Sequence, residues 1–397
     1  MLSFRGLAYG SAAILLGGTC VATLVAACGS ASEGASGFGY GDGGAPDSSG
    51  GRPDGASEGG AVDGGMDVGT GVPTTALFVQ ASPSLPDVRL CWGTGTTVAS
   101  IVPFPGDGVM PGSNYPGIPL GGVASMSDAS TLTGAFLLYA IDAENLARIE
   151  QNQPTPYTCD ELICAQGSST LPCLRYNLDY WPVTTSPVAL QSGANNVVAL
   201  GGCLPSALDP AASATLCGAS WTATAGNLEA QILPLASGGG AGSQLAVQAA
   251  QLSPGLAALL GDGGSAVVSF GTQGAADAST VATLQGEGVL ATQALVSVGI
   301  GLSVYGELGF AVDVPGFDGG AGHLWMSLAD SQQLVDPTQD PTQFFGQARP
   351  YLLAVLGDPN APHAFASGGD AGYDGKGLHV LVVAAPAPQV NADGGDE

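Results

Sequence analysis

The chain has 397 residues, with 33 Asp and Glu against 7 Lys and Arg, and a formal net charge of -26. That charge repels phosphate backbones, so we expect no nucleic-acid partner. Hydrophobic residues make up 45% of the chain and charged residues 10%, which excludes a chain that is disordered throughout. The 64 glycines follow no three-residue period, which excludes collagen.

The first 27 residues have the pattern of a bacterial lipoprotein signal peptide. Arg5 precedes an apolar stretch at 7–27, and the run LVAAC at 24–28 resembles a lipobox. We therefore expect cleavage before Cys28 and lipid attachment to its thiol. Cys20 is a weaker candidate, because Gly18 and Thr19 before it fit the small-residue requirement less well. The length would also allow a transmembrane anchor, but no basic flank follows the stretch. Gly29 directly follows the modified cysteine. By resemblance to Gram-negative lipoproteins, an Asp at this position would favour retention in the inner membrane. Because Asp is absent there, we expect the protein to be sorted to the outer membrane.

Residues 28–74 form a Gly- and Asp-rich segment that we predict to be a disordered linker holding the folded part off the membrane. Apolar residues are too scarce there to offset the chain entropy of folding. Its Asp-Gly pairs lack the ligand spacing of a calcium loop. Its GASEG string at 55–59 matches a nucleophile motif, but the strand–turn–helix setting of that motif is missing.

The remaining chain divides into two predicted domains, 75–236 and 243–388, followed by an acidic tail at 389–397. Short apolar stretches recur in the same order in both parts, which indicates a tandem repeat. The matched stretches are 77–81 with 245–249, 82–85 with 253–256, 137–146 with 324–334, 196–201 with 351–357, and 228–233 with 378–383.

Most of these stretches are short, rich in Val, Leu and Phe, and bounded by turn residues, which predicts strands. Residues 87–92 alternate, with Leu90 and Trp92 on one face and Cys91 on the other. Two short helices are expected, one at 143–150 capped by Asp142 and one at 331–335 capped by Asp330. We predict an all-β fold with short helical insertions, made of two tandem antiparallel immunoglobulin-like β-sandwich domains. A Gly-rich solenoid would need a repeat of about 20–30 residues, and none is found.

Six cysteines follow the lipobox, all in the first repeat. An even number in an exported domain indicates three disulfides, with 15 possible pairings. We expect Cys203 to pair with Cys217 across a short loop, and Cys91 to tie its strand to the insertion at 143–190. Zinc is disfavoured because the spacings lack the close pairs of zinc sites. The six are Cys91, Cys159, Cys164, Cys173, Cys203 and Cys217.

No motif in the sequence identifies a catalytic residue, a metal site or a cofactor. The histidines His323, His363 and His379 all lie in the second repeat, in settings that favour solvated or core-edge roles. The pair Asp160 and Glu161 is best interpreted as the solvated start of a helix. We therefore expect a protein that is not an enzyme and needs no cofactor.

Two aromatic residues are candidates for a ligand surface. Trp92 and Trp325 lie in apolar strand patterns and are expected in the core. Tyr180 and Trp181 precede Pro182, which marks an edge or a loop, so this pair could face solvent and stack on a sugar.

One family resemblance rests on short motifs. The run VQASPSLPDV at 79–88 resembles the opening of the bacterial cell-envelope family called domain of unknown function 4397. Residues 197–205 and 159–162 are similar to stretches of uncharacterised myxobacterial lipoproteins built on related domains. The resemblance covers most of 75–388 and has moderately specific motifs, and the second repeat departs from it at 250–254. It implies an envelope β-sandwich and supplies no catalytic residues.

These observations predict a non-catalytic outer-membrane lipoprotein with a binding or structural role at the cell envelope. Its expected partners are membrane lipid, through acylated Cys28, and an envelope protein or polysaccharide. A carbohydrate-binding module is the first alternative, for which an exposed Tyr180–Trp181 surface would be the discriminating feature. An envelope hydrolase is the second, and it would require a cleft with converging acid or base groups.

Overall fold

The computed structural model describes most of the chain between residues 73 and 386. All described residues belong to one compact unit, Val68–Glu397. The signal peptide, Cys28, residues 29–72 and the tail at 389–397 lie outside them. The described ranges are 73–95, 97–106, 117–151, 155–164, 173–184, 186–236, 244–261, 264–272, 279–285, 296–299, 307–314, 323–335, 339–346, 349–359 and 377–386.

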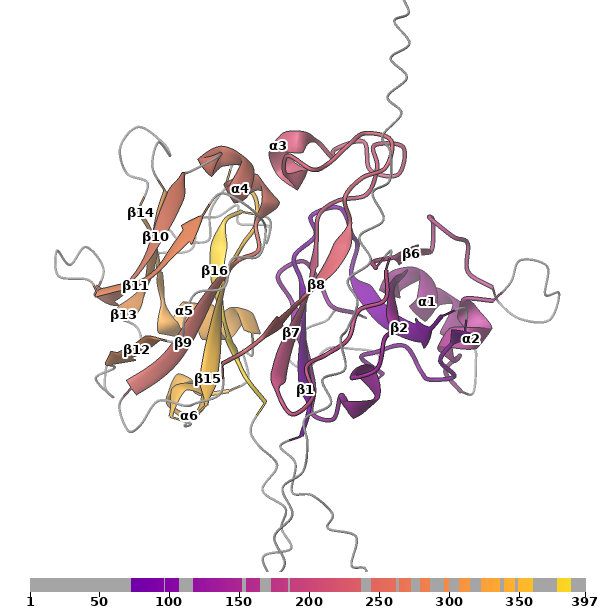
Figure 1. Ribbon diagram of the computed structural model, residues 1–397, viewed down its shortest axis with the longest axis horizontal. Coiled ribbons are helices and arrows are strands. Elements are labelled where there is room, and N and C mark those ends of the chain that lie inside the picture. Colours follow the sequence, from indigo (N-terminus) through magenta and orange to yellow (C-terminus); the bar gives the residue numbers. More distant parts are fainter. Residues whose placement is uncertain are drawn as a thin grey trace, which may run out of the picture. The chain divides into compact units, whose positions relative to one another are not determined.

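The first half of the fold contains strands β1 to β8 in two four-stranded sheets (Figure 1). The inner first sheet has the order β4-β1-β7-β8, and the outer first sheet has the order β3-β2-β5-β6. The strands are β1 Thr75–Gln80, β2 Val88–Thr94, β3 Thr97–Val98, β4 Val123–Met126, β5 Leu137–Asp142, β6 Tyr180–Pro182, β7 Asn195–Gly201 and β8 Glu229–Pro234.

The second half repeats this topology with strands β9 to β16. The inner second sheet has the order β12-β9-β15-β16, and the outer second sheet has the order β11-β10-β13-β14. Each strand therefore has a counterpart eight places earlier, and the all-β prediction is confirmed. The strands are β9 Gln244–Gln251, β10 Ser265–Thr272, β11 Ser279–Gln285, β12 Val296–Gly299, β13 Leu308–Asp313, β14 His323–Ser327, β15 Pro350–Leu356 and β16 His379–Ala384.

Both inner sheets contain one parallel pair, which differs from the purely antiparallel arrangement expected from the sequence. Strand β1 runs parallel to β7, and β9 runs parallel to β15. The chain needs a long crossover to return in the same direction, and the intervening strands of the outer sheet supply it.

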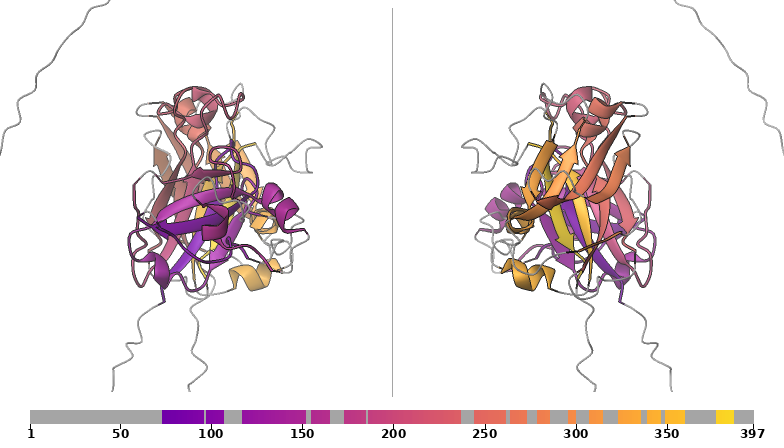
Figure 2. Two further views of the ribbon diagram at one scale, coloured as in Figure 1. Left: turned by 90° about the vertical axis from the view of Figure 1, so that its right-hand side faces the viewer. Right: turned by 90° about the vertical axis from the view of Figure 1, so that its left-hand side faces the viewer.

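Three apolar cores hold the sheets together, as alternate side chains of a strand point to opposite faces. Phe78, Leu90 and Val198 belong to the core between the inner and outer first sheets, and Phe310 and Leu353 to the equivalent core of the second half. Figure 2 gives opposite side views, in which the outer sheet of one half lies toward the viewer. A third core joins the two inner sheets and includes Leu77, Val79, Val197, Ala199, Leu352, Ala354, Leu381 and Val383.

The central strands β1, β7, β9 and β15 of the inner sheets are thus buried on both faces, which explains their sequence. Strands covered on both sides form continuous apolar runs instead of alternating patterns. All seven residues of β15 are buried accordingly. In β2, by contrast, Leu90 faces the sandwich core while Cys91 packs with Ile141 on the outer face, as the alternation predicted.

The helices are short and lie between strands. Asp142 caps α1, accepting hydrogen bonds from the backbone N–H groups of Glu144 and Asn145, as predicted. The second predicted cap is wrong: α5 begins before Asp330, whose N–H donates to Ser327 Oγ at 3.0 Å, so Ser327 caps the first turn. The helices are α1 Ala143–Glu150, α2 Cys159–Leu162, α3 Ala214–Cys217, α4 Pro254–Leu260, α5 Leu328–Val335, α6 Pro341–Phe345 and the 3-10 helix η1 Ser130–Leu132.

The topology agrees with four of the five sequence matches between the repeats. The match of 137–146 with 324–334 is wrong, because it equates β5 with β14, whereas the sheet order equates β5 with β13. The first match is correct in its strands but displaced. Gln80 Oε1 accepts from Ser82 N at 2.8 Å, and Gln251 Oε1 accepts from Ser253 N at 2.6 Å. Gln80 therefore corresponds to Gln251, three residues later than the sequence match placed it.

Candidate functional site

Three disulfides brace the first half. The expected pair Cys203–Cys217 is present, and Cys91–Cys159 ties β2 to the insertion, as proposed from the alternation of β2. The third bond, Cys164–Cys173, closes a loop within that insertion. The insertion is therefore held to the outer first sheet just before it reaches a short turn at 175–180.

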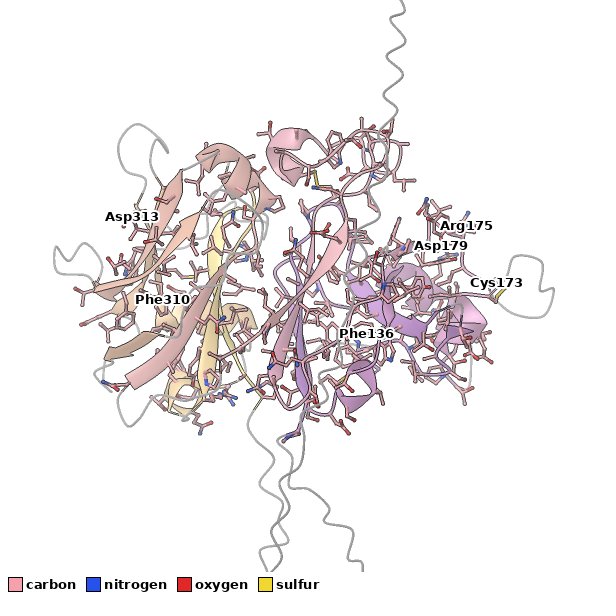
Figure 3. The ribbon with its side chains drawn as sticks, viewed as in Figure 1. Phe136, Cys173, Arg175, Asp179, Phe310 and Asp313 are labelled. Atoms are coloured by element: carbon pink, nitrogen blue, oxygen red, sulfur yellow. A yellow bond between two sulfur atoms is a disulfide. The ribbon has the colours of Figure 1, made fainter. Side chains whose placement is uncertain are left out.

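An ion pair organises this turn. Arg175 Nε lies 2.8 Å from Asp179 Oδ2, and Nη2 lies 2.9 Å from Oδ1 (Figure 3). The backbone N–H of Arg175 also donates to Oδ2, at 2.9 Å. The hydrogen bonds from Arg175 lower the pKa of Asp179 below its ordinary value. Asn177, at the tip, adopts a φ of 58°, a region that Asn tolerates better than most residues.

The turn exposes one aromatic and one aliphatic side chain. Tyr176 is 53% exposed and Leu178 is 50% exposed. The Tyr176 ring stands edge-on to Tyr180, with 5.8 Å between centroids, and Tyr180 in turn contacts Tyr139. Burial raises the pKa of Tyr180 above its ordinary value. The predicted ligand surface thus lies beside an aromatic cluster, although a different tyrosine presents its ring to solvent.

The sequence-based prediction that Trp181 faces solvent is wrong. It is only 6% exposed and packs in the core of the first half, because β6 pairs it with Ala140 of β5 and turns its side chain inward. Its Nε1 is buried, and no described residue accepts its hydrogen bond. An unpaired buried donor costs about 1–3 kcal/mol. An exposed Tyr180–Trp181 surface therefore does not exist, whereas Trp92 packs against the same core, as expected.

Loops of the inner first sheet form a second wall near β6. Asn227 holds these loops together: its Oδ1 accepts from Cys203 N at 2.8 Å, and its Nδ2 donates to Cys217 O at 2.8 Å and Ser220 Oγ at 2.9 Å. Gly226 has a φ of 67°, and a Cβ there would lie 2.5 Å from Cys203 O. The hydrogen bonds and the disulfide together make this wall rigid.

A pocket of about 620 Å³ lies between the turn, β6 and this wall. The backbone N–H of Ala230 in β8 donates to Val183 O at 3.0 Å, which joins the edges of the two sheets next to it. Trp181 contributes to the pocket lining as well as to the core. The lining comprises Tyr176, Asn177, Trp181, Pro182, Gly202, Leu204, Pro205, Ser220, Thr224, Ala225, Gly226, Asn227, Leu228, Glu229 and Gln231.

Polar and apolar groups share this lining. Gln231 Nε2 donates to Glu229 Oε1, which leaves Glu229 Oε2 as an acceptor. No hydrogen bond within the described residues engages the side chain of Asn177 or of Thr224. The pocket therefore offers an amide, a hydroxyl and a carboxylate oxygen beside an exposed tyrosine ring. Sequence reasoning missed these residues, although the spacing of Arg175 and Asp179 around Asn177 was a local signal of a turn.

The other residues singled out in the sequence lie elsewhere. Glu161 lies in the first turn of α2, where its Oε2 accepts from Thr158 N at 2.9 Å, so its pair with Asp160 is a helix start as expected. His379 is buried in β16, where burial lowers its pKa below the ordinary value. The side chain of His323 and the whole of His363 lie outside the described residues.

In the part of the chain that the structure describes, no three His, Cys, Asp or Glu side chains gather closely enough to hold a metal ion. Every helix found there is too short or too polar to cross a bilayer.

Comparison with known proteins gives no family assignment. No protein-family model matches the chain, and no curated protein matches it significantly.

Proposed function

We propose that this protein is a lipid-anchored, non-catalytic protein of the outer membrane, which binds a ligand at the cell envelope through the pocket of its first half. The observation that carries the binding role is the pocket itself, with its exposed Tyr176 and its side-chain groups free to form hydrogen bonds. Pockets of several hundred Å³ with a few convergent polar groups are the usual form of small-ligand sites.

The composition of the pocket favours binding over hydrolysis. Glycoside hydrolysis normally requires two carboxyl groups facing each other across the bond to be cleaved. Among the described lining residues only Glu229 has one, and Gln231 donates a hydrogen bond to it. Asn227, the best-connected polar residue of the wall, directs its hydrogen bonds to the backbone and to Ser220.

The anchor rests on the sequence around Cys28, together with the disulfides, which are typical of exported proteins. The resemblance to domain of unknown function 4397 supports the same localisation at the cell envelope. Metabolic labelling with a palmitate analogue tests the anchor. We expect label on the wild-type chain and none on Cys28→Ala, with Cys20→Ala labelled as the matched control. Label that persists on Cys28→Ala would refute Cys28 as the attachment site, and an unlabelled wild-type chain would refute the anchor.

Protease treatment of intact cells then tests which face of the membrane carries the folded part. Release of the folded part from intact cells would place the pocket at the cell surface. Protection until the outer membrane is permeabilised would place it in the periplasm, and recovery in the inner-membrane or soluble fraction would refute the outer-membrane assignment.

A further inference from the structure

We infer that the pocket beside the 175–180 turn binds a neutral saccharide. This inference rests on the proposed binding function and names the chemical class of its ligand. Three features of the pocket support it: its charge, its pairing of an aromatic ring with free polar groups, and the closure of the neighbouring strand edges.

The charge of the pocket excludes acidic ligands. Its lining contains no Lys, Arg or His among the described residues, and its one formally charged group is the Glu229 carboxylate. The formal net charge of -26 adds a long-range repulsion for anions. A phosphorylated, sulfated or uronic-acid ligand would therefore find no cationic partner among these lining residues, and Arg175, next to Tyr176 in the chain, is already hydrogen-bonded to Asp179. A ligand rich in neutral hydroxyl groups meets no such penalty.

The aromatic and polar groups match the two kinds of surface on a sugar. The C–H faces of a sugar ring are flat and apolar, and the exposed Tyr176 ring offers them a large surface with few torsions to restrict. Sugar hydroxyls both donate and accept hydrogen bonds. Asn177 supplies a donor and an acceptor, Thr224 a hydroxyl, and Glu229 Oε2 an acceptor.

The strand edges near the pocket are unsuited to an extended peptide. A peptide bound by strand addition needs free backbone N–H and C=O groups along an edge. The Ala230 N–H of edge strand β8 is already bonded to Val183 O, 3.0 Å away. Edge strand β6 consists of three residues and ends in Pro182, which has no N–H to donate. A saccharide is bound mainly through side chains, and the pocket lining supplies an aromatic ring and several polar side chains.

The test is calorimetric titration of the mature, full-length chain in detergent. The neutral probes are maltohexaose, cellohexaose, N-acetylchitohexaose and mannohexaose, the anionic probe is hexagalacturonate, and the peptide probe is decalysine. We expect at least one neutral probe to bind saturably and hexagalacturonate not to bind. We expect Tyr176→Ala to weaken binding about tenfold or more, as loss of an aromatic anchor does.

Matched variants separate the pocket from general effects. Leu178→Ala removes a similarly exposed side chain from the same turn, outside the pocket lining, and should leave affinity unchanged. Glu229→Gln should weaken binding, whereas Glu144→Gln, on the exposed side of α1, should not. Thermal denaturation should show that all four variants fold like the wild type.

Three results would overturn the inference. The first is no saturable binding of any neutral probe, and the second is binding that Tyr176→Ala leaves intact. The third is Tyr176-dependent binding of decalysine or hexagalacturonate without binding of a neutral probe, which would preserve a binding function but change its ligand. Failure of lipid labelling at Cys28 would refute the anchor alone, so the two proposals can fail separately.

Discussion

The guanidinium of Arg175 holds the carboxylate of Asp179 with two side-chain hydrogen bonds, 2.8 and 2.9 Å long. The Arg175 side chain is largely exposed, whereas that of Asp179 is 9% exposed. The buried carboxylate of Asp179 therefore holds the two ends of the turn together, while the Arg175 side chain lies on its solvent-exposed side. This closure places Tyr176 at the pocket and Trp181 in the core, so the shape of a candidate binding site depends on a short stretch of chain.

We expect Asp179→Ala to destabilise the protein by about 1–2 kcal/mol, since it removes a charged acceptor that takes two hydrogen bonds from the solvent-exposed guanidinium of Arg175 and one from the Arg175 backbone N–H. Saccharide affinity should fall in the same variant, because the turn that positions Tyr176 loses the hydrogen bonds between Arg175 and Asp179. Urea denaturation measures the free energy of unfolding. Glu144→Ala is the control, as this carboxylate is exposed on α1. Equal stability of the two variants would show that the turn does not depend on Asp179.

Stability should fall as pH drops below about 6.5 because of His379. Burial lowers the pKa of this histidine in the folded chain, so the folded state stays neutral while the unfolded chain takes up a proton near its ordinary pKa of 6.5. The unfolded state then binds more protons, and stability rises with pH in this window, by at most about 1.4 kcal/mol per pH unit.

Urea denaturation between pH 5 and pH 7.5 measures this dependence. We expect His379→Gln to have a shallower slope than the wild type between pH 5 and 6.5, whatever its stability at pH 7.5. Parallel curves for the two proteins would contradict the prediction.

The two long-range disulfides should differ in their contribution to stability. Cys91–Cys159 spans 68 residues and Cys203–Cys217 spans 14. The loop-entropy relation gives about 4 kcal/mol for the former and about 3 kcal/mol for the latter. We expect the paired variant Cys91→Ala/Cys159→Ala to unfold at lower urea than Cys203→Ala/Cys217→Ala. The reverse order would show that packing around the bond dominates over chain entropy.

The core between the inner sheets should make both halves unfold together. Leu352 is fully buried in this core, which also contains Leu77 and Val79 of the other half. We expect Leu352→Ala to cost about 2–5 kcal/mol and to shift a single unfolding transition observed by fluorescence and circular dichroism. Leu259→Ala, at a position 44% exposed on α4, should change stability by less than about 0.5 kcal/mol. Two separate transitions would mean that this core does not couple the halves.

The sequence by itself determined the strand content, the repeat and the sidedness of β2. Leu90 and Cys91 point to opposite faces because successive side chains in a strand alternate, a rule that needs no knowledge of the partners. The same local rule predicted that Cys91 bonds to the insertion at 143–190, where the structure identifies Cys159 as its partner, and short loop closure predicted Cys203–Cys217. Asp142 as a helix cap is equally local, because its carboxylate accepts hydrogen bonds from the backbone N–H groups two and three residues later.

The tertiary structure alone decided which aromatic side chain is exposed and where the pocket lies. Pro182 indicated an edge strand, and β6 is one, yet the face that Trp181 turns to the core depends on its register against Ala140. A shift of one residue would have exposed Trp181 and buried its neighbours. The pocket unites residues 176 to 231 through strand pairing and a disulfide. Such long-range contacts are set by the packing of the whole sandwich, and local sequence patterns carry no information about them.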